Sequence, residues 1–445
     1  MYFDKLALIL GSVAIDSLVL AGPVDVEKRW GISYGNRGDH VKAYQDWQSA
    51  SYDAGGDAPS STAYNGYNGG SNEGSNTASA SNSRPPQQTP PFSSAAPFPT
   101  SDSGDNPFIF PLSNGFPNIA SHSSQLNDIE NQAHGTLPNG PPPPNRPADD
   151  DLTSLRLIAF NELWEVAFFT ELLTNITQEV PGYQFQDQIQ KQTVIDTVTA
   201  VQAQEELHLL NANGALDHFK AGPIQPCQYI AGVDNFQDAI MTAATFTDVV
   251  LGTLGDVQTH FGDNGDSGLI GGVAAVIGQE GEQNGFYRNL LHEIPSAAPF
   301  LTASTREFAF SALNQNFVVQ GSCPNINTID LPVFGKLNLL TKNIQAQDQT
   351  LQFSFSATGQ YSQWASGQGM SLVYINQQNV PVVEPLTQAS TSHDGTVTFS
   401  ANFPFVENKM FGLTIAAVVQ GSGPFNNVTA VADAAKFGPA LIEID

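Results

Sequence analysis

A glutamate and a histidine three residues apart, Glu205 and His208, interrupt an apolar pattern in the stretch 194–212. The pattern advances by four and three residues in turn, so a helix would place its members on one face, directed at a core. Burying even a neutral polar group without a partner costs roughly 2–7 kcal/mol. A buried Glu-x-x-His pair therefore requires a metal ion, a second charge or other hydrogen-bonding side chains. The pattern consists of Val194, Val198, Val201, Glu205, His208 and Ala212.

Three further predicted helices, at 152–174, 236–261 and 268–293, carry polar residues that could surround this pair. The second predicted helix, 186–212, is followed by a long connection rich in Gly and Pro, 214–235. Four long helices with such a connection match ferritin-like bundles, in which metal ligands project into the core. The candidates are Glu162 and Glu165 on the first helix, Asp248 on the third, and Glu280 with Gln283 on the fourth.

A di-iron site of this type takes one Glu from each of two helices and a Glu-x-x-His from each of the other two. Here the second histidine is missing, because Gln283 follows Glu280 at that spacing. Occupancy by two metal ions is therefore in question. Without metal, one carboxylate would take up a proton or pair with His208 as imidazolium, and Gln283 could donate a hydrogen bond to the cluster.

A family resemblance rests on this Glu-x-x-His and on one stretch, Asn161-Glu162-Leu163-Trp164-Glu165-Val166-Ala167-Phe168-Phe169. Together they resemble the ferritin-like domain of secreted fungal late-sexual-development and stress-response proteins, which are related to plant desiccation-related proteins. The resemblance covers 152–323. It implies a bundle that binds iron or manganese at Glu162 or Glu165, Glu205, His208 and Glu280, and any activity would be of a metal-dependent oxidase type. The chain departs from the full ligand set at Gln283 and at the shorter Asp248.

The N-terminal third is predicted to be processed and then disordered. Residues 1–21 have the charge, apolar run and small-residue end of a secretory signal peptide. Lys28-Arg29 is either a processing site that ends a propeptide, 22–29, or two solvated charges. Residues 30–150 are rich in Ser, Asn, Gly and Pro without helical or strand period, which indicates a disordered spacer.

Composition argues against some partners, and the cysteines and glycosylation sequons fit the secretion that the signal peptide predicts. Forty-three acidic and 16 basic residues give a formal charge of −27, which argues against binding nucleic acid. No segment after the signal is long and apolar enough to predict a membrane span. Cys227 and Cys323 are the only cysteines and are expected to form a disulfide. Asn175 and Asn427 begin glycosylation sequons.

From residue 329 the period changes to alternating runs separated by Gly, Pro, Asn and Asp. This predicts a C-terminal antiparallel β-sandwich over 324–445, after a ferritin-like four-helix bundle over 151–323. Asp256 and His260, four residues apart, could bind a metal, but they lie at a helix end beside a loop rich in Gly and Asp, which favours a solvated face. The candidate metal ligands, the family resemblance and the predicted secretion leave two functions open. The chain is either a metal-binding protein of fungal development or stress response, or a non-catalytic protein with extracellular or cell-wall partners and a metal-free bundle.

Overall fold

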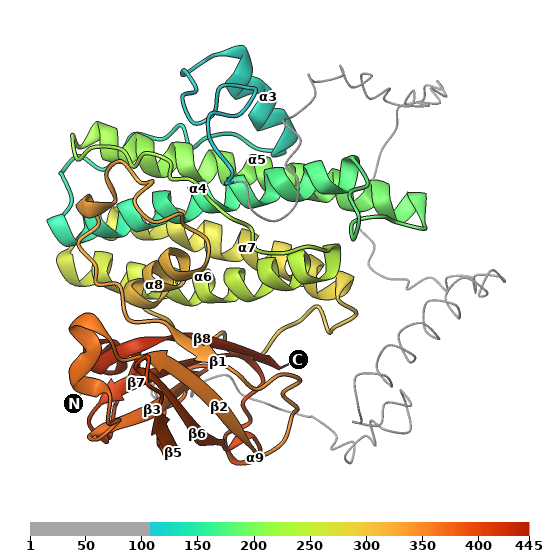
Figure 1. The fold of residues 1–445 in the computed structure, drawn as a ribbon. Coiled ribbons are helices and arrows are strands. Elements are labelled where there is room, and N and C mark those ends of the chain that lie inside the picture. Colours follow the sequence, from blue (N-terminus) through green and yellow to red (C-terminus); the bar gives the residue numbers. More distant parts are fainter. Residues whose placement is uncertain (1–106, 445) are drawn as a thin grey trace, which may run out of the picture. The chain divides into compact units, whose positions relative to one another are not determined.

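The computed structural model describes residues 107–444 of the 445-residue chain. These residues belong to one compact unit, in which a helical region comes first and an antiparallel β domain follows (Figure 1). This confirms the predicted order of helices followed by strands. The predicted signal peptide, the predicted propeptide and most of the predicted spacer lie outside the described residues.

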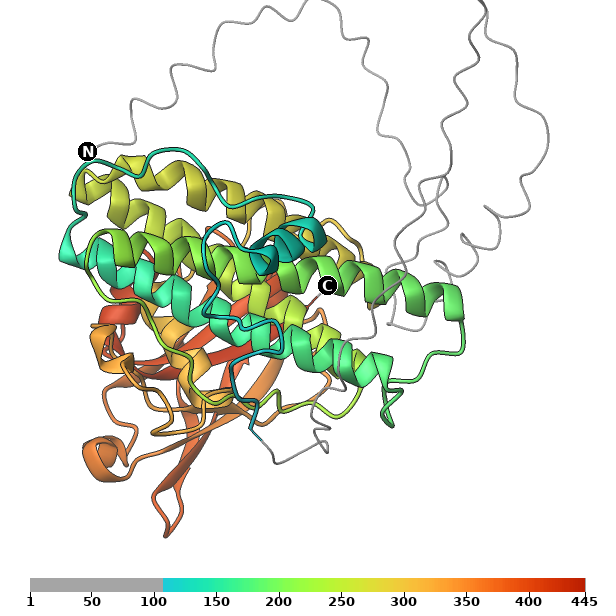
Figure 2. The same ribbon diagram turned by 90° about the horizontal axis from the view of Figure 1, so that it is seen from above.

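Four long helices make up most of the helical region (Figures 1 and 2). α4 packs along α5, α6 packs along α7, and α4 also contacts α6. A shorter helix, α8, packs against α4, α6 and the last strand. The helices are α4, Asp149–Thr177; α5, Gln188–His218; α6, Phe236–Asn264; α7, Ile270–Leu290, preceded by the 3-10 turn η1, Ser267–Leu269; and α8, Arg306–Asn316.

Side-chain chemistry accounts for where these helices begin and end. Three aspartates, 149–151, occupy the first turn of α4, where negative charge is favourable. Asp187 caps α5 by accepting hydrogen bonds from two backbone N–H groups, and Asn235 caps α6 by accepting one. Gly265 ends α6 with φ of +86°, a left-handed conformation that glycine adopts without strain. The positions of these helix ends determine which side chains of each helix face the interior.

Aromatic side chains hold α4 against α6 and α8. The ring of Trp164 lies with its centroid 4.1 Å from that of Phe246 on α6 and 4.5 Å from that of Phe317. Phe160 packs against Phe310 of α8 at 5.4 Å. Full burial of a large apolar side chain stabilises a fold by about 1.5–3 kcal/mol. These aromatic contacts therefore set the rotation of α4 about its axis, and with it the direction in which the acidic residues of α4 project.

Part of the predicted spacer is folded. Helix α3, Ser124–Gln132, packs Leu126 and Ile129 against Ala203 and Leu207 of α5. The prediction of disorder is therefore wrong for the described part of the spacer. Its apolar residues are too few to form a core of their own, but they gain burial from the outer face of an existing helix.

The two cysteines form the predicted disulfide. Cys227 and Cys323, 96 positions apart, join the connection after α5 to the loop after α8. Between them, Tyr229 pairs through its backbone with Phe108 on one side and Val318 on the other. The disulfide and these bridges hold three segments together that are distant in the sequence.

The β domain consists, in the described residues, of two four-stranded sheets in the orders β1-β2-β6-β5 and β4-β3-β7-β8. Each pairing between these strands is antiparallel, as predicted. The two sheets share a hydrophobic core, where Phe353 meets Tyr374 and Phe355 stacks on Phe437. The strands are β1, Leu337–Leu339; β2, Gln349–Ser356; β3, Met370–Asn376; β4, Val382–Pro385; β5, Thr387–Thr391; β6, Thr396–Phe403; β7, Gly412–Gln420; and β8, Ala435–Ile444. The short helices of this part of the chain are η2, Ile326–Thr328; η3, Gly359–Trp364; α9, Phe405–Asn408; and α10, Val428–Ala434.

The second sheet is covered on both faces. Every residue of β3 is buried, and so is every residue of β7 except its last. One face meets the first sheet, while on the other Val249 of α6 and Phe308 of α8 pack with Val373 and Ile415. Antiparallel sheets commonly have one face on the core and one in solvent. In this structure the helical region covers the face of the second sheet that would otherwise contact solvent.

One described helix, α6, is long and apolar enough to span a membrane by length and composition, although no span was expected there. Sixty-seven per cent of its most apolar window is buried inside the structure. This burial is typical of a core helix, and it accounts for the apolar composition of α6.

Candidate functional site

A cluster of buried acidic side chains lies between α4, α5 and α7. Glu162 of α4, Glu205 of α5 and Glu280 of α7 are each at most 1% exposed. His208 of α5 joins them, with its side chain 15% exposed. The structure therefore brings together four of the predicted ligands from three helices, and His208 is the most solvent-accessible of the four.

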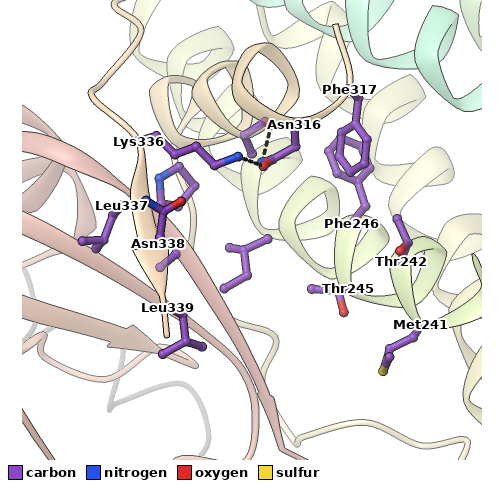
Figure 3. A pocket seen from close by; sticks show the side chains of 14 residues that line it. Met241, Thr242, Thr245, Phe246, Asn316, Phe317, Lys336, Leu337, Asn338 and Leu339 are labelled. Carbon is purple, nitrogen blue, oxygen red and sulfur yellow. Dashed lines mark hydrogen bonds between the residues drawn. The ribbon is translucent and has the colours of Figure 1, made fainter. Parts of the chain in front are cut away.

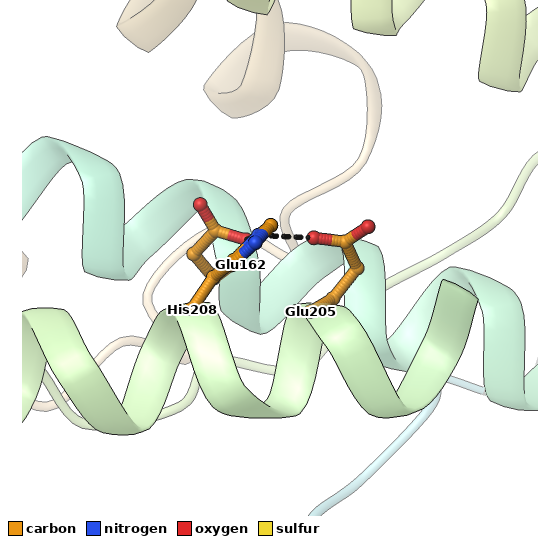
Figure 4. Close-up of side chains that lie close together, drawn as sticks. All are labelled: Glu162, Glu205 and His208. Carbon is orange, nitrogen blue, oxygen red and sulfur yellow. Dashed lines mark hydrogen bonds and ion pairs between the residues drawn. The ribbon is translucent and has the colours of Figure 1, made fainter. Parts of the chain in front are cut away.

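The cluster is centred on the imidazole of His208. Its Nδ1 lies 2.8 Å from Oε2 of Glu205, 3.5 Å from Oε2 of Glu162 and 3.9 Å from Oε1 of Glu280. Figure 4 shows Glu205 and His208 projecting from one face of α5 toward Glu162 on α4. One ligand atom from each of these three residues lies within 4.8 Å of the other two.

Several carboxylate oxygens in the cluster lack hydrogen-bond partners. Oε2 of Glu162 and both oxygens of Glu280 are fully buried and accept no hydrogen bond from any described residue. An unsatisfied buried polar group costs about 1–3 kcal/mol, and more when it is charged. Because these three oxygens belong to carboxylates beside the imidazole of His208, this site would bind protons or a cation.

The buried face of α7 is polar, which is unusual for a helix packed in a core. Gln283 lies on this face and directs its amide nitrogen toward α5. Its Nε2 donates to Oε1 of Glu205 at 2.7 Å and to Oε1 of Gln204 at 3.1 Å. Its own Oε1 accepts from the hydroxyl of Tyr287 at 3.4 Å. Gln283 therefore acts as a hydrogen-bond donor to the cluster, and the prediction of it as a metal ligand does not fit this geometry.

The two remaining predicted ligands have amide partners as well. Glu165, 3% exposed, accepts a hydrogen bond from Asn161 at 2.8 Å through Oε2. Asp248, 4% exposed, accepts one from Asn284 of α7 at 2.9 Å. The described acids within 4.0 Å of a ring nitrogen of His208 are Glu205, Glu162 and Glu280. We therefore separate Asp248 from the site.

Burial and mutual repulsion alter the protonation of the cluster. Burial raises the pKa of Glu162 to about 7, although the neighbouring His208 lowers it. Burial, followed by the negative charges around them, holds the pKa of Glu165 and that of Glu280 well above their ordinary range. Burial opposes the charged form of His208, but the carboxylates of Glu205 and Glu162 hold its pKa well above the ordinary value. The cluster thus retains protons near neutral pH when no cation replaces them.

The geometry of the cluster fits a small divalent ion. Ligand atoms about 2.1 Å from a common ion lie about 3.0–3.4 Å from one another. The distances from Nδ1 of His208 to its carboxylate neighbours, 2.8–3.9 Å, bracket that range. A donor set of carboxylates with one imidazole is typical of sites for iron and manganese. Glu162, Glu205, His208 and Glu280 are the residues that could hold such an ion.

Sequence reasoning missed a second buried carboxyl group. Glu206, 1% exposed, lies on the neighbouring face of α5 and accepts a hydrogen bond from the N-terminal part of the described chain. Its Oε1 accepts from Nδ2 of Asn114 at 3.3 Å and from Nε2 of Gln202 at 2.9 Å. No sequence signal distinguished Glu206, because its partner Asn114 lies in the predicted spacer. Burial raises the pKa of Glu206 to about 7.

Glu206→Gln is expected to stabilise the protein above neutral pH. The pKa of Glu206 rises from 4.5 to about 7 on folding, so the folded chain binds a proton that the unfolded chain releases, and stability falls as pH rises through this window. The difference corresponds to about 3 kcal/mol. Glutamine keeps an oxygen for both amide donors. Urea unfolding should show a gain of this order at pH 8 and little change below pH 4.5, and an equal gain at both pH values would contradict the assignment.

Asp256 and His260 belong to an ion-pair network at the junction of α4, α6 and α8. Nδ1 of His260 lies 2.8 Å from Oδ2 of Asp150, whose Oδ1 accepts from the buried Arg306 at 2.9 Å. Asp256, 12% exposed, accepts from the backbone N–H of Arg306 at 3.1 Å. The prediction of a solvated face is therefore wrong for Asp256. Arg306 explains the difference, since it begins a helix that the sequence did not connect to these residues.

A groove of about 380 Å³ lies between α6, α8, β1 and β8 (Figure 3). Its walls are mostly apolar, and Lys336 at its edge donates to Oδ1 of Asn316 at 2.9 Å. None of its lining residues is an acid, a histidine or a cysteine. Its ionisable lining residue, Lys336, has no acid or histidine beside it in the groove lining, so the acidic cluster is the stronger candidate site.

The two predicted glycosylation sites differ in accessibility. Asn175, in the last turns of α4, is buried, with 4% of its surface exposed. Asn427 is exposed and caps α10 through Oδ1, which accepts from the N–H of Ala430 at 2.9 Å. Its Nδ2, the atom that would carry a glycan, is not used in that cap. The burial of Asn175 weighs against glycosylation there, and glycosylation of either residue stays a prediction.

The geometry of the cluster is the main guide to function. A scan against protein-family models finds no match to this chain, and a search of the curated proteins finds none either. The side chains of α4, α5 and α7 are therefore the basis on which a function can be proposed.

Proposed function

We propose that the chain is a secreted ferritin-like protein that binds a divalent transition-metal ion, iron or manganese, through Glu162, Glu205, His208 and Glu280. One observation carries this proposal. Ligand atoms of three residues on two helices converge, and the buried carboxylate of Glu280 beside them has no hydrogen-bond partner among the described residues. The site would hold the metal, and iron bound there would supply the redox chemistry of an oxidase-type reaction.

The arrangement of the helices supports the ferritin-like part of the proposal. α4, α5, α6 and α7 lie alongside one another, and the chain makes its long connection between the second and third of them. The proposed ligands come from α4, α5 and α7 and project into the interior, as in metal-binding helical bundles. The resemblance of residues 152–323 to secreted fungal stress and development proteins suggests a role in handling metals or oxidants.

Metal analysis of the purified protein tests the proposal. Full-length protein expressed in medium supplemented with iron and manganese should carry metal after desalting, and His208→Ala should lose it. Glu206→Gln is a matched control, because Glu206 is also a buried acid of α5 but accepts its hydrogen bonds, among the described residues, from Asn114 and Gln202. Metal content that is unchanged by His208→Ala would count against the proposed site.

A second function is a metal-free protein with extracellular or cell-wall partners. The hydrogen bonds of Glu205 favour it, since His208 and Gln283 already satisfy both of its oxygens. Glu162 and Glu280 weigh against it, because three of their buried oxygens have no hydrogen-bond partner among the described residues. Protein that binds neither iron nor manganese, with an unchanged fold, would favour this second function.

Secretion predicts a single N-linked glycan at Asn427. Protein produced in a glycosylating eukaryotic host should lose mass on enzymatic deglycosylation, and Asn427→Gln should abolish that loss. Asn175→Gln is the matched control and should leave the glycan mass unchanged, because Asn175 is buried. A glycan that disappears with Asn175→Gln instead would contradict the description of the α4 terminus.

A further inference from the structure

We infer that the acidic cluster holds one metal ion, not two, because side-chain amides occupy the half of the cluster where a second ion would bind. The inference rests on the proposed metal-binding function and concerns its stoichiometry. It follows from which carboxylate oxygens accept hydrogen bonds from side-chain amides and which do not. Gln283 is the residue that decides it.

One half of the cluster has no amide donor among the described residues, and an ion there would displace the proton between Nδ1 of His208 and Oε2 of Glu205. This half consists of Nδ1 of His208, Oε2 of Glu205, Oε2 of Glu162 and the carboxylate of Glu280. Among the described residues, none donates a hydrogen bond to this oxygen of Glu162 or to either oxygen of Glu280. An ion placed here would meet an imidazole nitrogen and oxygens from three carboxylates. These donors are enough to hold one divalent ion.

The other half of the cluster is closed by amide groups. Oε1 of Glu205 accepts from Gln283 at 2.7 Å, and Oε2 of Glu165 accepts from Asn161 at 2.8 Å. A second ion that used Glu205 and Glu165 would have to compete with these amides for the same oxygens. An amide N–H supplies the positive end of a dipole to a carboxylate without adding a charge. The amides therefore satisfy these oxygens in place of an ion.

The orientation of Gln283 is fixed by its other partners. One hydrogen of Nε2 is directed at Glu205 and the other at Oε1 of Gln204, while the hydroxyl of Tyr287 donates to Oε1 of Gln283. Turning the amide over would direct its oxygen at a carboxylate and at another amide oxygen. It would also leave the buried Tyr287 hydroxyl without its acceptor. Gln283 therefore cannot offer its oxygen to a metal without breaking three hydrogen bonds.

The next residue of α7, Asn284, also directs its amide at a carboxylate. Its Nδ2 donates to Oδ1 of Asp248 at 2.9 Å. Asp248 is the only acid of α6 among the predicted ligands, and it lies outside the group that converges on His208. α6 therefore adds no carboxylate for a second ion. Of these two consecutive amides, Gln283 is therefore the one that occupies a carboxylate oxygen of the cluster.

Manganese stoichiometry of the full chain tests the inference. Equilibrium dialysis against Mn²⁺ should give one bound ion per wild-type chain, with the electron paramagnetic resonance spectrum of an isolated ion. Gln283→Glu removes the amide donor and adds a carboxylate at the same position, so it should bind two ions. Gln283→His, which offers a neutral nitrogen ligand, should also bind two. In two-metal sites the ions lie about 3.5–4 Å apart, so their spectra should show magnetic coupling.

Gln279→Glu is the matched control. Gln279 also lies on α7 and donates to Gln204, but it makes no hydrogen bond to a carboxylate of the cluster. This variant should bind one ion. Two coupled ions in the wild type would overturn the inference while leaving the proposed function intact, and so would one ion in both folded Gln283 variants. Failure of the wild type to bind any Mn²⁺ would overturn the proposed function and this inference with it.

Discussion

Mn²⁺ at 100 times its dissociation constant is expected to raise the free energy of unfolding at pH 8 by about 2.7 kcal/mol. The reason is that the folded chain gathers Glu162, Glu205, Glu280 and His208 in one place, whereas the unfolded chain does not. The bound ion would also relieve the repulsion between buried carboxylates. Urea unfolding followed by circular dichroism, with and without Mn²⁺, measures the increment.

The same increment should shrink at pH 5. Carboxyl groups whose pKa is raised by burial, such as Glu162 with a pKa of about 7, are then protonated and His208 is charged, so protons compete with the ion. His208→Ala should lose most of the increment at pH 8, whereas Glu206→Gln should keep it. An equal Mn²⁺ effect in wild type and His208→Ala would show that the ion binds elsewhere on this acidic protein.

Removal of the disulfide is expected to be the most destabilising change outside the cluster. Replacing both Cys227 and Cys323 with alanine releases a constraint between residues 96 positions apart. For a loop of roughly this length the chain-entropy estimate is about 4–5 kcal/mol. Alanine is suitable because Cys227 is 3% exposed and a polar replacement would add a desolvation cost.

Urea unfolding at neutral pH, with and without reductant, measures this effect. The wild type should lose stability on reduction, and the double alanine variant should not respond to reductant. A loss below about 1 kcal/mol would mean that the backbone bridges from Tyr229 to Phe108 and Val318 hold these segments without the disulfide.

The sequence predicted the cluster because burial and helical spacing constrain it. The alternation of four and three residues placed Glu205 and His208 on one face, and α5 indeed buries Glu205. Glu162 and Glu280 were found by the same reasoning on α4 and α7. The disulfide followed from there being two cysteines, and the β domain from the change of period after residue 329.

What could not be predicted depends on contacts between distant segments. α3 packs against Leu207 of α5, and the composition of residues 124–132 does not predict a contact with a helix so far along the sequence. Asn175 belongs to a sequon, but the structure buries it at the end of α4. The direction of the Gln283 amide is set by Gln204 and Tyr287, and a sequence does not show which end of an amide faces a carboxylate.

The most direct measurement is a crystal structure of the protein soaked in Mn²⁺, with anomalous scattering used to locate the ion. One anomalous peak is expected about 2.0–2.2 Å from Nδ1 of His208 and from carboxylate oxygens of Glu162 and Glu205. Glu280 should then move or turn to complete the coordination. A fully soaked crystal with no peak among these residues, and with the Glu205 to His208 hydrogen bond intact, would contradict the central claim that this cluster is a metal site.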